Sequence, residues 1–223
     1  MSLAEIRSEI GQLVSGRVGI ADGILPPIVF IAINAFWGLT PAAVLGLGSA
    51  LLISGYRLAR GRPTRFALAG LFGTAIAALL ALRSGSSAEY FLPGIVSGAL
   101  TTLAIVISAF IGKPFLAWTS WLTRGWPLGW YWHPQVRPAY SRAGWLWAGF
   151  FAMRTLIQWQ LYSNDETVAL GITRVLMGWP ALLLLLILTY TLGRRWLVTL
   201  GGPSVEEFET ESPPPWSVQP TGF

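Results

Sequence analysis

The sequence predicts an all-α membrane protein, a polytopic transmembrane helical bundle of about six spans with both termini in the cytoplasm. Hydrophobic residues make up 53% of the 223-residue chain and charged residues only 11%, and the mean hydropathy is +0.57. This composition is too apolar for an ordinary soluble domain. Because a helix needs about 20 mostly apolar residues to cross a bilayer, the apolar runs of this chain use up most of its length.

Residues 1–23 precede the first apolar run and have the pattern of an amphipathic cytoplasmic helix. Leu3, Ile6, Ile10 and Leu13 recur at helical spacing, and polar residues fill the other faces. The segment lacks the continuous apolar core of a cleavable signal peptide. We expect it to lie on the membrane surface or against the bundle, and a partner-binding helix is the alternative.

Residues 24–195 form the predicted membrane domain. Its six spans are residues 24–38, 41–56, 66–82, 91–112, 144–162 and 168–192. Only two residues separate the first two spans, which predicts a tight helical hairpin or helices that extend into flanking polar residues. Apart from tyrosine, Arg154 and Arg174 are the only ionisable residues in the spans. Gly94 and Gly98 form a small-xxx-small pair that packs within the bundle or between copies, so a homo-oligomer is an open alternative.

The loops predict the orientation of the bundle. Basic residues concentrate in every second loop and after the last span: Arg57, Arg60, Arg62, Arg65, Lys113, Arg124, Arg137, Arg142, Arg194 and Arg195. The alternate loops hold Arg83 with Glu89, and then Asp165 with Glu166. The positive-inside rule therefore places both termini in the cytoplasm. We expect the basic loops to contact anionic lipid headgroups, and we expect no binding of nucleic acid.

Residues 113–143 form a tryptophan-rich loop between the fourth and fifth spans. Its aromatic residues are interleaved with basic ones: Phe115, Trp118, Trp121, Trp126, Trp130, Tyr131, Trp132 and Tyr140. Tryptophan and tyrosine prefer the headgroup level of a membrane. We expect an interfacial helix near residues 114–123 followed by a proline-punctuated loop, with binding of a lipid headgroup or a partner as the alternative.

Residues 196–223 form the predicted cytoplasmic tail. Its acidic block and its proline run are Glu206, Glu207, Glu209, Glu211 and residues 213–215. Such a segment buries too little apolar area to offset the entropy of ordering it, so we expect it to be disordered. The prolines favour local polyproline II structure, which can recruit a partner.

The residue inventory argues against an enzyme. His133 is the only histidine and the chain contains no cysteine. The usual nitrogen and sulfur ligand sets for zinc or copper, a cysteine nucleophile and a disulfide framework are therefore excluded. A Ser/His/Asp triad would depend on this single loop histidine. We expect no catalytic residues, no metal and no cofactor.

Arg154, Gln158, Arg174 and Asn34 form the predicted intramembrane polar site. A charge at membrane depth costs about 3 kcal/mol on insertion scales, so neither arginine is a neutral feature. The predicted topology places all four residues in the outer half of their spans. Arg154 and Gln158 share a helix face because they are four residues apart. Small residues flank Arg174 on its own face, which favours an inward direction, whereas the direction of Arg154 stays open.

Two interpretations of the arginines remain. In the favoured one, both side chains snorkel outward toward Asp165 and Glu166, because these acids are close in sequence and no acid lies at membrane depth. In the other, the arginines line a polar cavity that receives an anionic group, such as a lipid phosphate or a small anion. The lack of intramembrane carboxylates argues against ion-coupled transport, although backbone carbonyls at broken helices can still bind ions.

Three short motifs resemble a known family. They are Leu-Pro-Pro-Ile-Val-Phe at 25–30, Gly-Lys-Pro-Phe at 112–115 and Trp-Ala-Gly-Phe-Phe at 147–151. These resemble actinobacterial integral membrane proteins with domain of unknown function 3159, which are distantly similar to the intracellular septation protein A family. The resemblance covers roughly residues 24–195. It implies a multi-pass plasma-membrane protein tied to envelope or division machinery, without catalytic residues, and an association with potassium uptake.

Two functional hypotheses follow. The first is a non-enzymatic scaffold or accessory factor that organises membrane protein partners for the cell envelope or cell division. The alternative is a transporter, channel or accessory subunit for ions, with potassium or a small anion as solute and a polar cavity at Arg154 and Arg174. A lipid enzyme is disfavoured because no acid, histidine or metal set converges at membrane depth.

Overall fold

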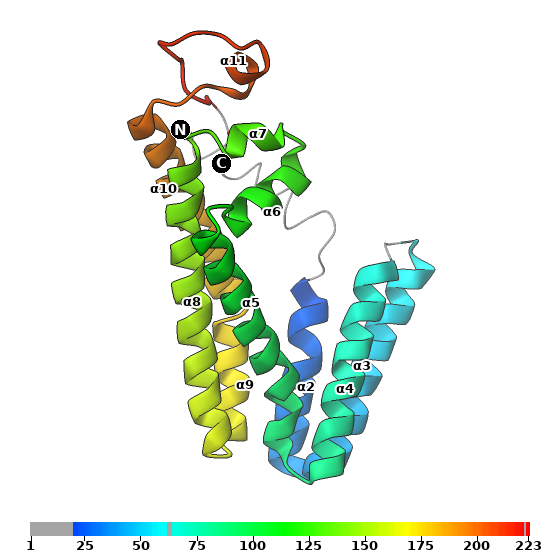
Figure 1. The fold of residues 1–223 in the computed structure, drawn as a ribbon. Coiled ribbons are helices and arrows are strands. Elements are labelled where there is room, and N and C mark those ends of the chain that lie inside the picture. The colour runs from blue at the N-terminus through cyan, green and yellow to red at the C-terminus, as the bar shows by residue number, and fades with distance from the viewer. Residues whose placement is uncertain (1–19, 62–63, 221) are drawn as a thin grey trace. The chain divides into compact units, whose positions relative to one another are not determined.

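The computed structural model describes residues 20–61, 64–220 and 222–223 (Figure 1). Its elements are α2 (Ile20–Trp37), α3 (Leu39–Ala59), α4 (Thr64–Ser84), the 3-10 helix η1 (Ser87–Phe91), α5 (Leu92–Phe110), α6 (Phe115–Arg124), α7 (Leu128–Tyr131), α8 (Arg137–Ser163), α9 (Thr167–Leu176), α10 (Trp179–Leu200) and α11 (Val205–Glu209). The described part contains no strand, so the predicted all-α class is confirmed. The amphipathic helix is expected over residues 1–23. Residues 1–19 lie outside the described part of the chain, and α2 begins at Ile20.

Three helices in the described part are long and apolar enough to cross a membrane: Leu39–Ala59, Ser87–Phe110 and Thr167–Leu200. Two shorter apolar helices span Leu25–Trp37 and Leu68–Ser84. Helix α8 is also long, but it carries three arginines, Arg137, Arg142 and Arg154. At most 28% of any of the three spans is buried inside the protein, as expected for helices that face lipid. The structure is consistent with an integral membrane protein.

Contacts divide the chain into two compact units. Unit 1 comprises Met1–Ile95 and Ile157–Pro180, and unit 2 comprises Val96–Leu156 and Ala181–Phe223. Helices α5 and α8 each contribute residues to both units. The break between α9 and α10, at Met177 and Gly178, lies within unit 1.

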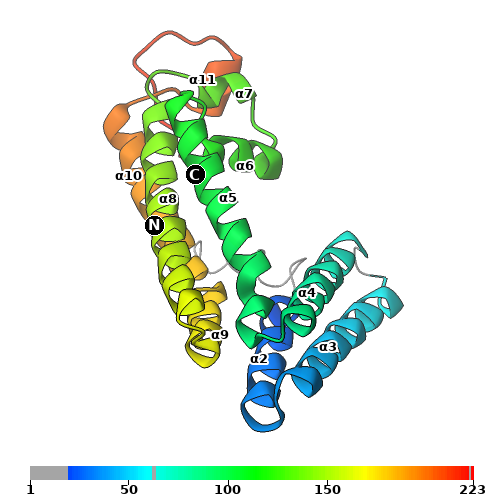
Figure 2. The ribbon, with the colours of Figure 1, turned by 60° about the horizontal axis from the view of Figure 1, so that its bottom comes forward.

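Helices α2, α3 and α4 lie side by side in unit 1 (Figures 1 and 2). Gly38 alone separates α2 from α3 and has a φ of 81°, which glycine adopts without steric cost. The structure therefore shows both predicted alternatives together, a tight helical hairpin and helices that extend into flanking polar residues, since α2 includes Asp22 and α3 includes Arg57. The core contains Phe30, Leu170 and a set of alanines that allow close packing of the helices, Ala42, Ala43, Ala77, Ala78 and Ala81.

Helices α5, α8 and α10 are joined in unit 2 by side-chain contacts. The Trp147 indole N–H donates to the Thr189 hydroxyl at 2.8 Å, and the rings of Phe110 and Trp145 meet edge to face at 5.7 Å. Pairs of this kind add stability beyond the apolar area that they bury. They connect α8 to α10 and to α5.

The tryptophan-rich segment contains the predicted helix, which is α6, but the rest is more compact than expected. It folds into α7, and α8 begins at Arg137 rather than near residue 144. Trp130 and Tyr131 are 0% exposed and Tyr140 is 1% exposed, so these rings form a protein core and do not anchor at a surface. The segment is more compact than expected because the rings of Trp130, Tyr131 and Tyr140 pack edge to face on one another inside unit 2.

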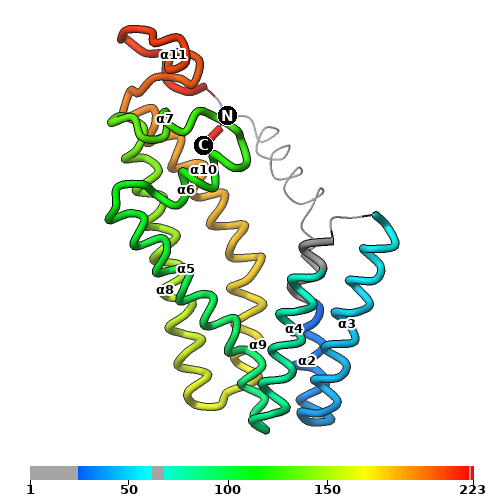
Figure 3. The backbone as a smooth tube through the Cα atoms, turned by 45° about the vertical axis from the view of Figure 1, so that its right-hand side comes forward, coloured from blue at the N-terminus to red at the C-terminus, as the bar shows by residue number. Residues whose placement is uncertain are grey.

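The carboxyl-terminal tail is folded in the structure, although the sequence predicted disorder. Helix α10 runs to Leu200, α11 follows, and the chain turns back toward α6 and α7 within unit 2 (Figure 3). Phe208, Val218 and Phe223 pack against the aromatic core of the unit. These few apolar side chains provide burial that the low average hydrophobicity of the tail does not reveal.

Candidate functional site

Arg174 lies in α9 of unit 1, and a close helix contact positions it. One turn earlier, Leu170 is buried and Gly171 faces Ile31 of α2. A Cβ built on Gly171 would overlap the Ile31 side chain, so the missing side chain allows the two helices to approach. This contact fixes α9 against α2 and directs the next turn into the unit.

The Arg174 guanidinium lies against α5. A Cβ built on Gly94 would overlap it, so the absence of a side chain at Gly94 creates the space that the guanidinium occupies. The Arg174 Cζ atom is 5.9 Å from the centroid of the Phe91 ring, which is within the range of a cation–π contact. Its Nη1 atom is buried and has no hydrogen-bond partner in the structure.

An aromatic cluster supports this part of unit 1. The rings of Phe30 and Tyr90 stack at 3.8 Å with an interplanar angle of 7°, and the Phe91 ring meets both edge to face. Gly46 of α3 leaves room for the cluster, since a Cβ there would be 3.7 Å from the Tyr90 hydroxyl and 3.5 Å from the Phe30 Cβ. The guanidinium therefore borders an apolar wall, where its charge is screened less than in water.

The polar groups at the loop end of unit 1 are occupied by other partners. The Ser87 hydroxyl donates to Asn34 Oδ1 at 2.7 Å, and the Ser86 hydroxyl donates to Asp165 Oδ1 at 3.1 Å. The Tyr162 hydroxyl donates to Glu89 at 2.7 Å. Asn34 is therefore part of a hydrogen bond between α2 and η1.

The structure does not show the favoured outward snorkelling of Arg174. Its guanidinium is directed at Gly94, and the part of the chain that the structure describes contains no ion pair between Arg174 and a carboxylate. The close contact of Gly171 with α2 explains why the inward direction prevails. Proximity in sequence to Asp165 and Glu166 was a poorer guide than the small residues on the helix face.

Gln158 supplies a second buried donor in unit 1. Its side chain is 2% exposed, and its Nε2 atom has no hydrogen-bond partner in the structure. Arg154, one turn earlier in α8, is half-buried and belongs to unit 2. The structure thus places Arg174, Gln158 and Asn34 in one compact unit and Arg154 in the other.

Sequence reasoning missed Gly94 and Phe91 as neighbours of Arg174. The available signal was the Gly94 and Gly98 pair, which indicated helix packing without identifying what packs there. In the structure, Gly94 receives Arg174, and Gly98 faces the Thr155 hydroxyl of α8, which would be 2.7 Å from an added Cβ. Both glycines therefore allow close packing within a single chain.

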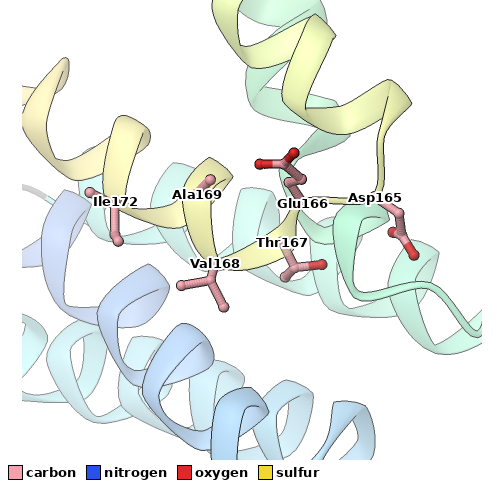
Figure 4. A pocket seen from close by; sticks show the side chains of 6 residues that line it. All are labelled: Asp165, Glu166, Thr167, Val168, Ala169 and Ile172. Atoms are coloured by element: carbon pink, nitrogen blue, oxygen red, sulfur yellow. The ribbon is translucent and has the colours of Figure 1, made fainter.

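An open surface depression lies beside the start of α9 (Figure 4). Residues from Asp165 to Ala169 and Ile172 line it, with the two acidic side chains on the loop. It offers no cationic side chain, and Arg174 does not line it. Within the described ranges, no group of three His, Cys, Asp or Glu side chains is placed to hold a metal ion.

These features define a class of protein, a helical membrane-type bundle with an arginine buried among its helices. The chain matches a family model described as a protein of unknown function (DUF3159) over residues 14–198, and it therefore belongs to this family. The resemblance to domain of unknown function 3159 is confirmed. No curated protein and no solved structure matches the chain significantly.

Proposed function

We propose that the protein is a non-enzymatic, multi-pass plasma-membrane protein that binds an anionic group at Arg174 and takes part in small-anion movement as a carrier, channel or accessory subunit. The buried Arg174 Nη1 atom without a partner carries this proposal. A buried charge is unfavourable unless another group compensates it, and the described residues supply Arg174 with no carboxylate. An anion from outside the chain would compensate it.

The chemistry of the site favours an anion over potassium. A guanidinium carries a permanent positive charge and presents donors in a plane, which suits phosphate and carboxylate groups. The second unpartnered donor of unit 1, Gln158 Nε2, has the same preference for an acceptor. A free anion and the phosphate of a lipid share this chemistry.

The proposal includes six membrane spans with both termini in the cytoplasm. Five of the apolar runs overlap α2, α3, α4, α5 and α8, and the sixth is divided between α9 and α10. The basic residues flank these helices on the side that the positive-inside rule would assign to the cytoplasm. Those loops would contact anionic headgroups, since such contacts contribute about 1 kcal/mol for each basic residue near the surface.

Anion flux in reconstituted vesicles tests this function. We expect the purified protein to raise chloride or phosphate flux above that of empty vesicles. Arg174→Leu should lower this flux at least tenfold, Arg174→Lys should lower it less, and Arg83→Leu, at an exposed position in the last turn of α4, should leave it unchanged. If the ligand is a lipid phosphate, native mass spectrometry should instead show an anionic lipid that Arg174→Leu loses. Equal flux and equal lipid retention in folded Arg174→Leu would rule out the site.

A scaffold for envelope or division partners is the second candidate. The observation that favours the scaffold role is a folded region of unit 2 in which α6, α7 and α11 pack around an aromatic core. A photocrosslinker at exposed Glu209 should capture the same protein partner repeatedly in membranes, whereas one at Leu52 of α3 should capture lipid. Recovery of lipid alone from both positions would contradict the scaffold role.

A further inference from the structure

Residues 216–220 and 222–223 near the carboxyl terminus occupy a groove in unit 2 that is built around one aromatic ring. The Phe223 ring stacks on the Tyr140 ring with centroids 4.5 Å apart and an interplanar angle of 8°. On α10, a Cβ built on Gly193 would overlap the Phe223 ring. Tyr140 and Gly193 thus form a pocket that fits a planar ring and has no room for a side chain at position 193.

Two arginines bind the backbone of this segment. Arg194 Nη2 donates to the Pro220 carbonyl at 2.7 Å, and Arg124 Nε donates to the main-chain oxygen of Phe223, the last residue of the sequence, at 3.3 Å. Because main-chain oxygens are common to all residues, these hydrogen bonds do not depend on the side chains of the bound segment. The guanidinium of Arg124 also lies 5.0 Å from the Trp126 ring centroid, which fixes its position.

Close approach also restricts the backbone between these contacts. Gly222 has a φ of 85°, and a Cβ there would be 2.6 Å from Arg124 Nη1 and 2.8 Å from Trp126. A small residue must therefore precede the ring in this conformation. The groove selects a short segment with a ring at one position and, immediately before it, a small residue that can adopt a positive φ.

The rest of the tail is held by hydrogen bonds among its own residues and by ring contacts such as that of Trp216 with His133, whose centroids are 5.2 Å apart. The Ser217 N–H donates to Glu207 Oε1 at 2.8 Å, and the Val205 N–H donates to Gln219 Oε1 at 2.9 Å. These bonds connect the segment to α11 and its flank. They shape the tail but do not belong to the groove.

We propose that this groove, formed by Tyr140, Gly193, Arg124 and Arg194, is a peptide-binding site for a short, aromatic-bearing segment of a partner protein. The tail of the chain itself occupies it as an intramolecular competitor. In peptide recognition, hydrogen bonds to the main chain provide affinity and side-chain pockets provide specificity. The two arginines and the ring pocket supply both. The inference deepens the scaffold function, on which it rests, and is independent of anion binding at Arg174.

The test uses the full-length protein in detergent and a fluorescent, carboxyl-amidated peptide with the sequence of residues 216–223. In the variant Phe223→Ser, the ring pocket is vacated, and we expect at least tenfold tighter peptide binding by anisotropy than to the unmodified protein. Adding Gly193→Val to this variant should abolish binding, because the new side chain occupies the place of the ring. Adding Gly144→Ala, where a Cβ meets nothing within 4 Å, should leave binding unchanged.

Specificity and fold are checked together. A peptide with alanine in place of its final phenylalanine should bind at least tenfold more weakly, and monodisperse elution of every variant confirms folding. Equal binding to Phe223→Ser with and without Gly193→Val would overturn the proposal. Dimerisation of the unmodified protein by exchange of tails would also overturn it, since the groove would then serve a second copy. Persistent binding with loss of the crosslinked partner would overturn the scaffold function alone.

Discussion

At the scale of single residues, a glycine determines where the arginine side chain lies. Gly94 leaves the space on α5 that the Arg174 guanidinium fills, and Gly171 brings α9 close enough to α2 for this to happen. Sites of this kind are sensitive to the addition of one methyl group, because a packed interior cannot relax freely.

We predict that Gly94→Ala destabilises the protein by about 1–3 kcal/mol, the usual cost of overpacking, and weakens anion binding. The new methyl group would displace the guanidinium from its position. Gly48→Ala is the matched control, because Gly48 is also helical and a Cβ there meets nothing within 4 Å. This control should be neutral or stabilising by up to about 1 kcal/mol, as alanine is the better helix former.

Thermal unfolding in detergent, with and without the anion, measures both effects of the Gly94 substitution. The ligand-dependent rise in Tm should shrink in Gly94→Ala and persist in Gly48→Ala. An unchanged rise in both variants would show that the guanidinium position at Gly94 does not matter for binding.

At the scale of elements, α11 illustrates how a very short helix is stabilised. The Ser204 hydroxyl accepts a hydrogen bond from the Glu207 N–H at 3.2 Å, and the Glu207 carboxylate accepts one from the Ser204 N–H at 2.8 Å. This reciprocal arrangement is a capping box. Because isolated helices of a few residues are unstable, the element depends on these bonds and on Phe208 packing.

We predict that the tail loosens in acid. Hydrogen bonds from the backbone N–H groups of Ser204 and Ser217 lower the pKa of Glu207 from 4.5 to about 2. Since the pKa is depressed in the folded state, its stabilising contribution is present above pH 4.5 and is lost as the pH falls from 4.5 toward 2. Glu207→Gln should loosen the tail already at neutral pH.

A spin label at Glu209→Cys measures the mobility of the tail. The label is unambiguous because the chain has no cysteine of its own. We expect its spectrum to sharpen as the pH falls through the stated window, and to be sharp throughout in the Glu207→Gln background. Glu206→Gln should behave like the parent, since Glu206 accepts no capping bond from Ser204. Identical titrations in both backgrounds would contradict this role of Glu207.

At the scale of the whole molecule, hydropathy predicted most helices but not the start of α8 or the tail that packs beside the helices. The apolar runs locate α3 and α4 within a few residues, because lipid-facing helices need little specific packing. The start of α8 and the ordered tail were missed, since both depend on a few aromatic contacts such as Phe223 on Tyr140. Such contacts connect residues far apart in sequence, and average composition does not reveal them.

The candidate site was likewise predictable from the sequence only in part. The inward direction of Arg174 followed from small residues on its own helix face, a local pattern that sequence displays. The contact of Arg174 with Gly94 could not be predicted in this way, because α6, α7 and α8 separate α5 from α9 in the sequence. The grouping of Gln158 with Arg174 in unit 1, without Arg154, likewise depends on tertiary contacts.

The proposed six-span topology can be tested by single-cysteine labelling, which has no background because the chain contains no cysteine. Exposed Arg83 lies in the last turn of α4 and exposed Asn164 follows α8, so their cysteine variants should react with an impermeant maleimide outside intact cells. Arg60→Cys and Glu209→Cys should react only after the membrane is opened, because α4 separates 60 from 83 and α9–α10 separates 164 from 209. Reaction of Glu209→Cys in intact cells would contradict a cytoplasmic tail. If the cysteines at positions 60 and 83 both reacted from the same side of the membrane, α4 would not be a membrane span.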